Sequence, residues 1–97
     1  MTTASQVGQA FYEGRKLTGG TRGNIKSLKI GDHVYLIGYG WAIYGKHDLK
    51  TGKITYYSGW RGYSRTTSKH LSQTGIMHKH DIKSSDKPTL EDIKGEL

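Results

Sequence analysis

A β-hairpin predicted over residues 41–58 constrains the fold of this chain more than any other feature. Two stretches rich in aromatic and β-branched residues, 41–47 and 53–58, flank the short connection DLKTGK. Within that connection, Gly52 supplies the positive φ that hairpin loops commonly need. Side chains alternate between the two faces of each strand. We therefore expect one face of the hairpin to be buried and the other to point outward.

The segments before the hairpin predict one helix, one loop and one strand. Residues 3–16 are expected to form a short helix, because apolar side chains recur near helical spacing behind candidate caps. Residues 18–27 are expected to form a loop, since they include three glycines and an asparagine. Residues 28–39 predict a strand entered through a Gly31-Asp32 turn, and its two apolar faces are typical of a central strand.

The segment after the hairpin, residues 63–75, is open to two interpretations. Ser64 can cap a helix and Gly75 can end it, which favours a short and mostly exposed helix. Tyr63 and the two threonines that follow favour β structure instead, so a final strand is the alternative.

These segments together predict an α+β fold: a small curled antiparallel sheet of three to four strands, an N-terminal helix and a short helix after the hairpin. A chain of 97 residues is expected to form one domain with a small core. We place that single basic domain in residues 1–80. Apolar residues become sparse beyond it, so residues 81–97 are expected to be a flexible, acidic-leaning tail.

The charge of the chain is unevenly divided between these two parts. Residues 1–80 carry twelve Lys or Arg and three acids, and residues 81–97 carry three Lys and five acids. The formal charge of +7 is therefore +9 on the body and −2 on the tail. A basic body attracts polyanions such as nucleic acid or acidic protein surfaces. The alternative is that the charge serves only solvation.

Several protein classes are excluded by composition. With no Cys there is no disulfide framework, no Cys-ligated zinc and no thiol nucleophile. The longest apolar run, residues 34–37, is far shorter than the roughly 20 residues that cross a bilayer, so we expect no membrane association. Residues 1–10 lack the basic start and apolar stretch of a secretory signal. Gly38-Tyr39-Gly40 lacks the helix that a nucleotide-binding glycine loop requires.

The five histidines give weak signals for catalysis or metal binding. His33, His47 and His70 have the chemistry of a general acid-base pair, but nothing in their spacing distinguishes such a pair from surface histidines. His78 and His80 supply two metal ligands at most, and a third has to come from elsewhere. We therefore expect no enzyme, metal or cofactor, with a small His-dependent nuclease as the less favoured alternative.

Aromatic and basic residues are interleaved in the middle of the chain. Eight of the ten aromatic residues lie between Tyr35 and Tyr63. Exposed rings stack on bases while Lys and Arg hold phosphates, the combination typical of single-strand nucleic-acid binding. The loop of residues 59–69 adds hydroxyls and arginines that suit a phosphate or carboxylate. The predicted contact residues are Tyr44, Lys46, Lys53, Tyr57, Trp60, Arg61, Tyr63, Arg65 and Lys69.

Two other roles for these aromatic residues stay open. About half of the rings are expected in the core, since the chain has few other large apolar residues to fill it. Exposed Tyr, Trp and Arg also serve as anchors in protein interfaces.

Three short motifs resemble an uncharacterised domain of phage and archaeal-virus proteins. Its pattern is a GN element, a strand of the type Leu-Tyr-x-Tyr-Gly-x-x-Ile-Ala, and a closing Tyr-Ser-x-Thr-Thr-x-x-His. In this chain the closing element is matched at Tyr63, Ser64, Thr66, Thr67 and His70, and the GN element at Gly23 and Asn24. The central element departs from the pattern at residues 41–43. The resemblance covers about residues 7–75 and implies a virus-encoded accessory protein of the host cytoplasm, with no assigned reaction.

The functional hypothesis is therefore a small viral accessory protein that binds DNA or RNA through an aromatic and basic surface. The alternative is a protein-directed inhibitor of a host defence or transcription complex, whose partner is a protein complex. A homo-oligomer is also open, because the strand at residues 34–37 is apolar on both faces.

Overall fold

Five strands form an antiparallel meander, and a sixth strand from the C-terminal part of the chain extends it. The computed structural model describes residues 3–19 and 24–96. The elements are α1 (Ala4–Glu13), β1 (Leu17–Gly19), β2 (Ile25–Ile30), β3 (His33–Gly38), β4 (Ala42–Asp48), β5 (Ile54–Tyr57), η2 (Ser58–Trp60), α2 (Arg65–Thr74), β6 (Ile82–Ser84) and η3 (Leu90–Glu96). The sheet order is β1-β2-β3-β4-β5-β6, and only the β5–β6 pair is parallel.

The α+β class is confirmed, but the expected sheet of three to four strands is wrong. Most of β1 and the first half of β2 fall within residues 18–27, which the glycine content predicted to be a loop. The predicted strand of residues 28–39 is divided at the Gly31-Asp32 turn into the end of β2 and β3, which pair antiparallel. Residues 20–23, with Gly23 of the GN element, lie outside the described residues. β2 forms because Ile25 and Ser27 are buried on pairing with β3, and the Ser27 hydroxyl donates to the Arg15 carbonyl at 2.6 Å.

The local signals of the helices and the hairpin are confirmed. Thr3 caps α1 through a capping box, and Gly14 ends it with a φ of 76°. Residues 63–75 contain a helix rather than a strand, since the Ser64 hydroxyl caps α2 and Gly75 ends it with a φ of 73°. β4 and β5 pair as predicted around a loop in which Gly52 has a φ of 75°.

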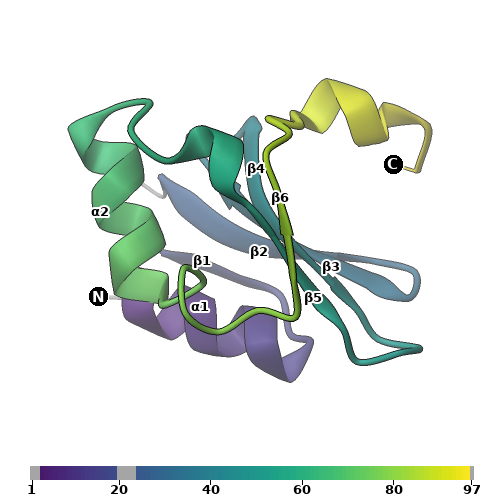
Figure 1. Ribbon diagram of the computed structural model, residues 1–97. Coiled ribbons are helices and arrows are strands. Elements are labelled where there is room, and N and C mark those ends of the chain that lie inside the picture. The colour runs from purple at the N-terminus through teal and green to yellow at the C-terminus, as the bar shows by residue number, and fades with distance from the viewer. Residues whose placement is uncertain (1–2, 20–23, 97) are drawn as a thin grey trace.

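Both faces of the sheet are covered, and by different elements. Figure 1 shows α1 and α2 on one side of the sheet and η3 on the other. The helix side holds the larger core, which includes Phe11 of α1, Leu71 of α2 and Leu36 of β3. On the opposite side, called here the second face, Ile37 and Ile43 pack with Ile93 of η3. The two apolar faces of β3 are therefore buried within one chain, and β3 needs no second copy to cover it.

The segment assigned to a tail contributes to the sheet. Ile82 pairs with Thr55, and the Asp81 N–H donates to the Ile54 carbonyl at 2.8 Å. Further along, Thr89 forms a bridge with Ala42. This segment was predicted to be a tail because its apolar residues are sparse. Its backbone pairs with β5, and such pairing does not require apolar side chains, so hydropathy did not predict it. In the described part of the chain, no helix is long and apolar enough to cross a membrane.

Candidate functional site

The nine predicted contact residues fall into three separate places. Tyr44 lies in the helix-side core and is fully buried, with its hydroxyl 3.3 Å from Nδ1 of His70. Burial raises the pKa of Tyr44 to about 12. Tyr44 is therefore not available to stack on a base. The expected division of the hairpin into two faces is wrong: it grouped Ile43 with Tyr56 and set Tyr44 on the outer face, whereas Tyr44 and Tyr56 both lie in the helix-side core and Ile43 packs on the second face. The pairing of β3 with β4 shifts register between Leu36 and Ile37, which breaks the strict alternation beside Tyr44.

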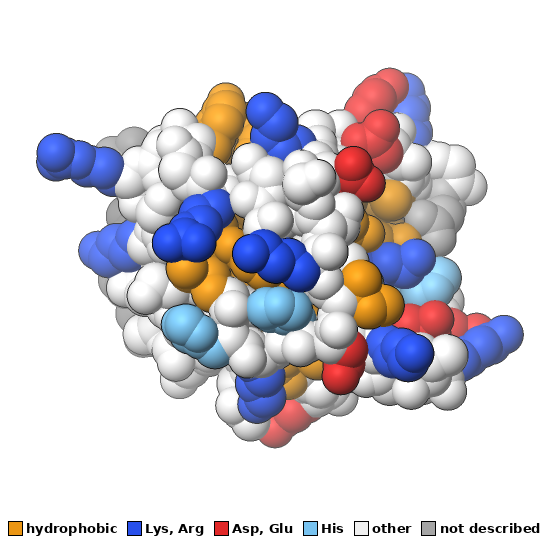
Figure 2. Space-filling view, in the orientation of Figure 1, with side chains coloured by type: hydrophobic (Ala, Val, Ile, Leu, Met, Phe, Trp, Pro, Cys, Tyr) orange, Lys and Arg blue, Asp and Glu red, His pale blue; other side chains and the backbone are white. Residues whose placement is uncertain are grey.

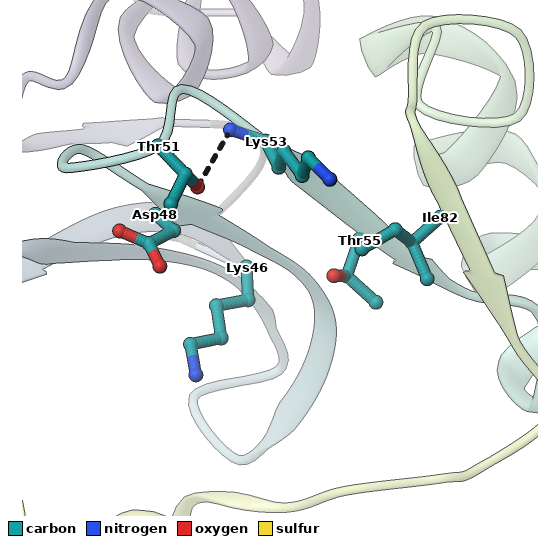
Figure 3. A pocket seen from close by; sticks show the side chains of 6 residues that line it. All are labelled: Lys46, Asp48, Thr51, Lys53, Thr55 and Ile82. Atoms are coloured by element: carbon teal, nitrogen blue, oxygen red, sulfur yellow. Dashed lines mark hydrogen bonds between the residues drawn. The ribbon is translucent and has the colours of Figure 1, made fainter.

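Lys46, Lys53 and Tyr57 belong to the second face. Lys46 of β4 pairs with Tyr35 of β3 on one side and with Thr55 of β5 on the other. Tyr57 is half-buried, and burial raises its pKa. A hollow of about 240 Å³ lies beside Lys46, and Figure 3 shows the side chains that line it. It is lined by Lys46, Asp48, Thr51, Lys53, Thr55 and Ile82.

The charges around this hollow are mixed. The backbone N–H of Lys50 donates to Asp48 at 2.9 Å and keeps the pKa of that carboxyl below its usual value. Asp48 therefore adds a negative charge to the same hollow that Lys46 and Lys53 line, and Figure 3 labels all three side chains. A polyanion meets opposing charges here.

The third place is the segment in which β5 leads through η2 into α2. It contains Trp60, Arg61, Tyr63, Arg65 and Lys69. Three rings meet at this point: Trp41 and Trp60 at 5.2 Å, Trp60 and Tyr63 at 5.2 Å, and Trp41 and Tyr63 at 6.0 Å between centroids. All three contacts are edge-to-face. Trp60 is 3% exposed, whereas Trp41 is 39% and Tyr63 56% exposed. Trp60 is thus buried, and its ring packs beneath the two exposed rings of Trp41 and Tyr63.

Trp41 was missing from the predicted contact residues. It follows a tight turn in which Tyr39 and Gly40 both have positive φ, of 56° and 77°. Such a turn reverses the chain between β3 and β4 and leaves Trp41 at the corner of the sheet. Four glycine-aromatic pairs recur in the sequence, and three of them, Gly40-Trp41, Gly59-Trp60 and Gly62-Tyr63, mark the rings that meet, whereas the fourth, Gly38-Tyr39, does not.

A C-terminal strap, defined here as residues 84–90, holds these rings in place. The Pro88 carbonyl accepts the N–H of Ile43 at 3.0 Å and Nε1–H of Trp60 at 3.2 Å. The Leu90 N–H donates to the Trp41 carbonyl at 2.7 Å. The two tryptophans are therefore tied to the same short segment, from a part of the chain assigned to a tail.

Three exposed cations lie in the same segment of chain as Trp60 and Tyr63. Among the described residues, no salt bridge engages Arg61, Arg65 or Lys69, whereas Arg15, Lys50 and Lys94 each have a carboxylate partner. Arg65 and Lys69 are one turn apart on α2 and project from the same side of it. Figure 2 shows Lys and Arg side chains projecting over α2, while acidic side chains gather over η3. We call Trp41, Trp60, Arg61, Tyr63, Arg65 and Lys69 the aromatic-basic corner.

The start of α2 adds hydroxyl groups beside the aromatic-basic corner. The Ser64 hydroxyl accepts the Thr67 N–H at 3.1 Å. Burial acts to raise the pKa of Tyr39, but hydrogen bonds with the hydroxyls of Thr66, Ser64 and Thr67 outweigh it and hold that pKa below its usual value. The positive end of the helix dipole lies at the same point. This end of α2 is therefore electropositive and rich in donors.

His33, His47 and His70, the candidates for an acid-base pair, lie in different surroundings. His33 and His47 project from opposite faces of the sheet, because they pair with Asp48 and Val34 in neighbouring positions. His70 is buried on α2. In the part of the chain that the structure describes, no three His, Cys, Asp or Glu residues are grouped so as to hold a metal ion.

Protonation of His70 is expected to destabilise the fold. His70 is 6% exposed and packs against Tyr39 at 5.8 Å and Tyr44 at 6.0 Å. Burial, and then the charge of Lys69, lower the pKa of His70 below 6.5. The unfolded chain therefore binds a proton more readily than the folded protein, and stability is lost as the pH falls below about 6.5.

This prediction is measured as the urea midpoint of unfolding at pH 7 and pH 5. The urea midpoint should be lower at pH 5 than at pH 7, and this decrease should be smaller in His70→Gln. His78→Gln, at an exposed position, is the matched control and should show the same decrease as the parent. Protonation of the Asp48 carboxyl affects stability only below about pH 4, outside this pH range. An equal fall in His70→Gln and the parent would contradict the assignment.

The aromatic-basic corner is thus the strongest candidate site, because it combines exposed rings with cations that have no carboxylate partner among residues 3–19 and 24–96. The second face offers Lys46 and Lys53 in mixed surroundings, and Tyr44 is in the core. Among known proteins, no family model, no curated protein and no solved structure matches this chain.

Proposed function

We propose that this protein binds nucleic acid through the aromatic-basic corner. The observation that carries the proposal is the pair of exposed rings, Trp41 and Tyr63, supported on buried Trp60 beside three cations without a carboxylate partner among the described residues. Rings of this kind contribute stacking to bases, and unpaired Arg and Lys contribute phosphate contacts. We further propose, from the motif resemblance, that it acts as a virus-encoded accessory protein in the host cytoplasm.

Each component of the corner has a role in this proposal. Arg61 and Arg65 neutralise phosphates, since guanidinium groups pair well with phosphate oxygens. Lys69 adds a charge one turn along α2. The positive end of α2 and its hydroxyl groups favour an anion at the same point. The alternative is a protein target, because Trp, Tyr and Arg are also the common anchors of protein interfaces.

The proposal predicts that binding depends on the charges of the corner and not on net charge alone. Arg61→Gln/Arg65→Gln should weaken binding of a labelled 20-nucleotide strand, measured by fluorescence anisotropy from 50 to 200 mM salt. Removing two phosphate contacts should reduce the slope of log affinity against log salt by about 1.5.

Lys46→Gln/Lys53→Gln removes the same charge from the second face and should change the slope much less. Equal changes in both double variants would contradict the site. No binding at 50 mM salt, combined with capture of a host protein from nuclease-treated lysate, would replace the proposal with the protein-directed alternative.

A further inference from the structure

We infer that the ligand of the aromatic-basic corner is an unpaired nucleic-acid strand, whose bases stack separately on Trp41 and Tyr63. This inference rests on the proposed function and specifies its substrate class. It follows from how the two exposed rings are oriented and from what lies around them.

The ring orientation excludes a continuous base stack as the ligand. The planes of Trp41 and Tyr63 are inclined at 80°, with centroids 6.0 Å apart. A base that stacks on one ring lies parallel to it, so bases on the two rings are nearly perpendicular to each other. Neighbouring bases of a duplex are parallel and have their faces covered by each other. Only a strand with unstacked bases can use both rings.

Contacts with Trp60 and with the strap hold Trp41 and Tyr63 in this orientation. Trp60 contacts both rings edge-to-face at 5.2 Å and is itself buried. The strap binds the backbone of Trp41 and the indole N–H of Trp60. The Tyr63 N–H donates to the Trp60 carbonyl at 3.1 Å. The exposed rings are therefore presented before a ligand arrives, which lowers the entropy lost on binding.

The corner is built for contact with base faces and phosphates rather than for reading base edges. Its exposed groups are two rings and three cations. Every base has a π-face, so stacking on these rings tolerates any sequence. Three phosphate contacts on a single strand give a slope of about −2 in log affinity against log salt.

The test uses the intrinsic fluorescence of the full chain with four probes at equal salt. The chain has two tryptophans, Trp41 and Trp60, and only Trp41 is substantially exposed, so quenching reports a base on that ring. The probes are a 12-nucleotide oligo(dT), an oligo(U) of the same length, a 12-base-pair duplex and inorganic polyphosphate. The unpaired strands should quench Trp41 and bind at least tenfold more tightly than the duplex.

Variants separate stacking from charge. Tyr63→Ala, at a residue exposed enough to leave the fold intact, should weaken binding of the unpaired strands about tenfold and leave duplex and polyphosphate binding unchanged. Trp41→Ala should act alike, with its fold checked by circular dichroism.

The outcomes distinguish the inference from the proposed function. If duplex or polyphosphate binds as tightly as the unpaired strands, and Arg61→Gln/Arg65→Gln still weakens that binding, the inference is overturned and the proposed function stands. If no nucleic-acid probe binds, the proposed function itself fails.

Discussion

Replacing Gly38 by alanine is expected to lower the melting temperature by about 10–20 °C, which corresponds to about 3 kcal/mol of lost stability. A Cβ at this position would overlap the hydroxyl, Cζ and Cε2 of Tyr44. Tyr44 is fully buried and its hydroxyl contacts His70, so the ring has no free space to enter. Either the ring or the end of β3 has to move.

Two further variants identify the cause of this loss. Gly52→Ala introduces a methyl group where no atom lies within 4 Å, at a φ of 75°, and should cost only about 1 kcal/mol from backbone strain. Combining Gly38→Ala with Tyr44→Leu removes the ring that the methyl group meets. In a double-mutant cycle the two substitutions should therefore be less harmful together than their separate costs imply. Additive costs, measured by thermal circular dichroism, would show that Tyr44 is not the obstacle.

Replacing Trp60 by alanine should affect stability and binding together. A buried Trp or Phe truncated to Ala costs about 3–5 kcal/mol, and Trp60 also donates to Pro88 and supports Trp41 and Tyr63. The denaturant midpoint should fall. Under conditions where the variant stays folded, affinity for an oligonucleotide should fall about tenfold or more, since both exposed rings lose their support.

Trp60→Phe provides the matched comparison for this prediction. It keeps an aromatic ring in the core and removes the Nε1 hydrogen bond to Pro88, a loss of about 1 kcal/mol. Its affinity should stay near that of the parent. If Trp60→Ala binds as the parent does while folded, the support of the exposed rings by Trp60 is contradicted.

Much of the secondary structure was predictable because its signals are local. The hairpin loop, the caps of both helices and their terminal glycines act over a few residues, as the Ser64 to Thr67 hydrogen bond illustrates. The first half of β2, residues 25–27, was missed because the neighbouring glycines favour a loop, and burial of Ile25 and Ser27 outweighs that preference.

The composition of the candidate site was predictable in part. The sequence predicted contacts in the segment from Trp60 to Lys69, and in the structure Arg61, Tyr63, Arg65 and Lys69 of that segment are exposed while Trp60 is buried. Tyr44 was misplaced because a register shift between β3 and β4 breaks the strict alternation on which the prediction relied. Trp41 was missed because its role depends on Trp60 and Tyr63, far from it in the chain.

The sequence by itself determined the hairpin, the helix ends and the concentration of charge on residues 1–80, since turn conformations, caps and charges belong to neighbouring residues. Only the tertiary structure decided that Tyr44 is inside, that Trp41 is outside and that the strap from the acidic end holds the corner. Those outcomes depend on contacts such as Tyr44 with His70 and Trp60 with Pro88, which are 26 and 28 residues apart. Such contacts form only when β4, β5 and α2 pack, so no local pattern encodes them.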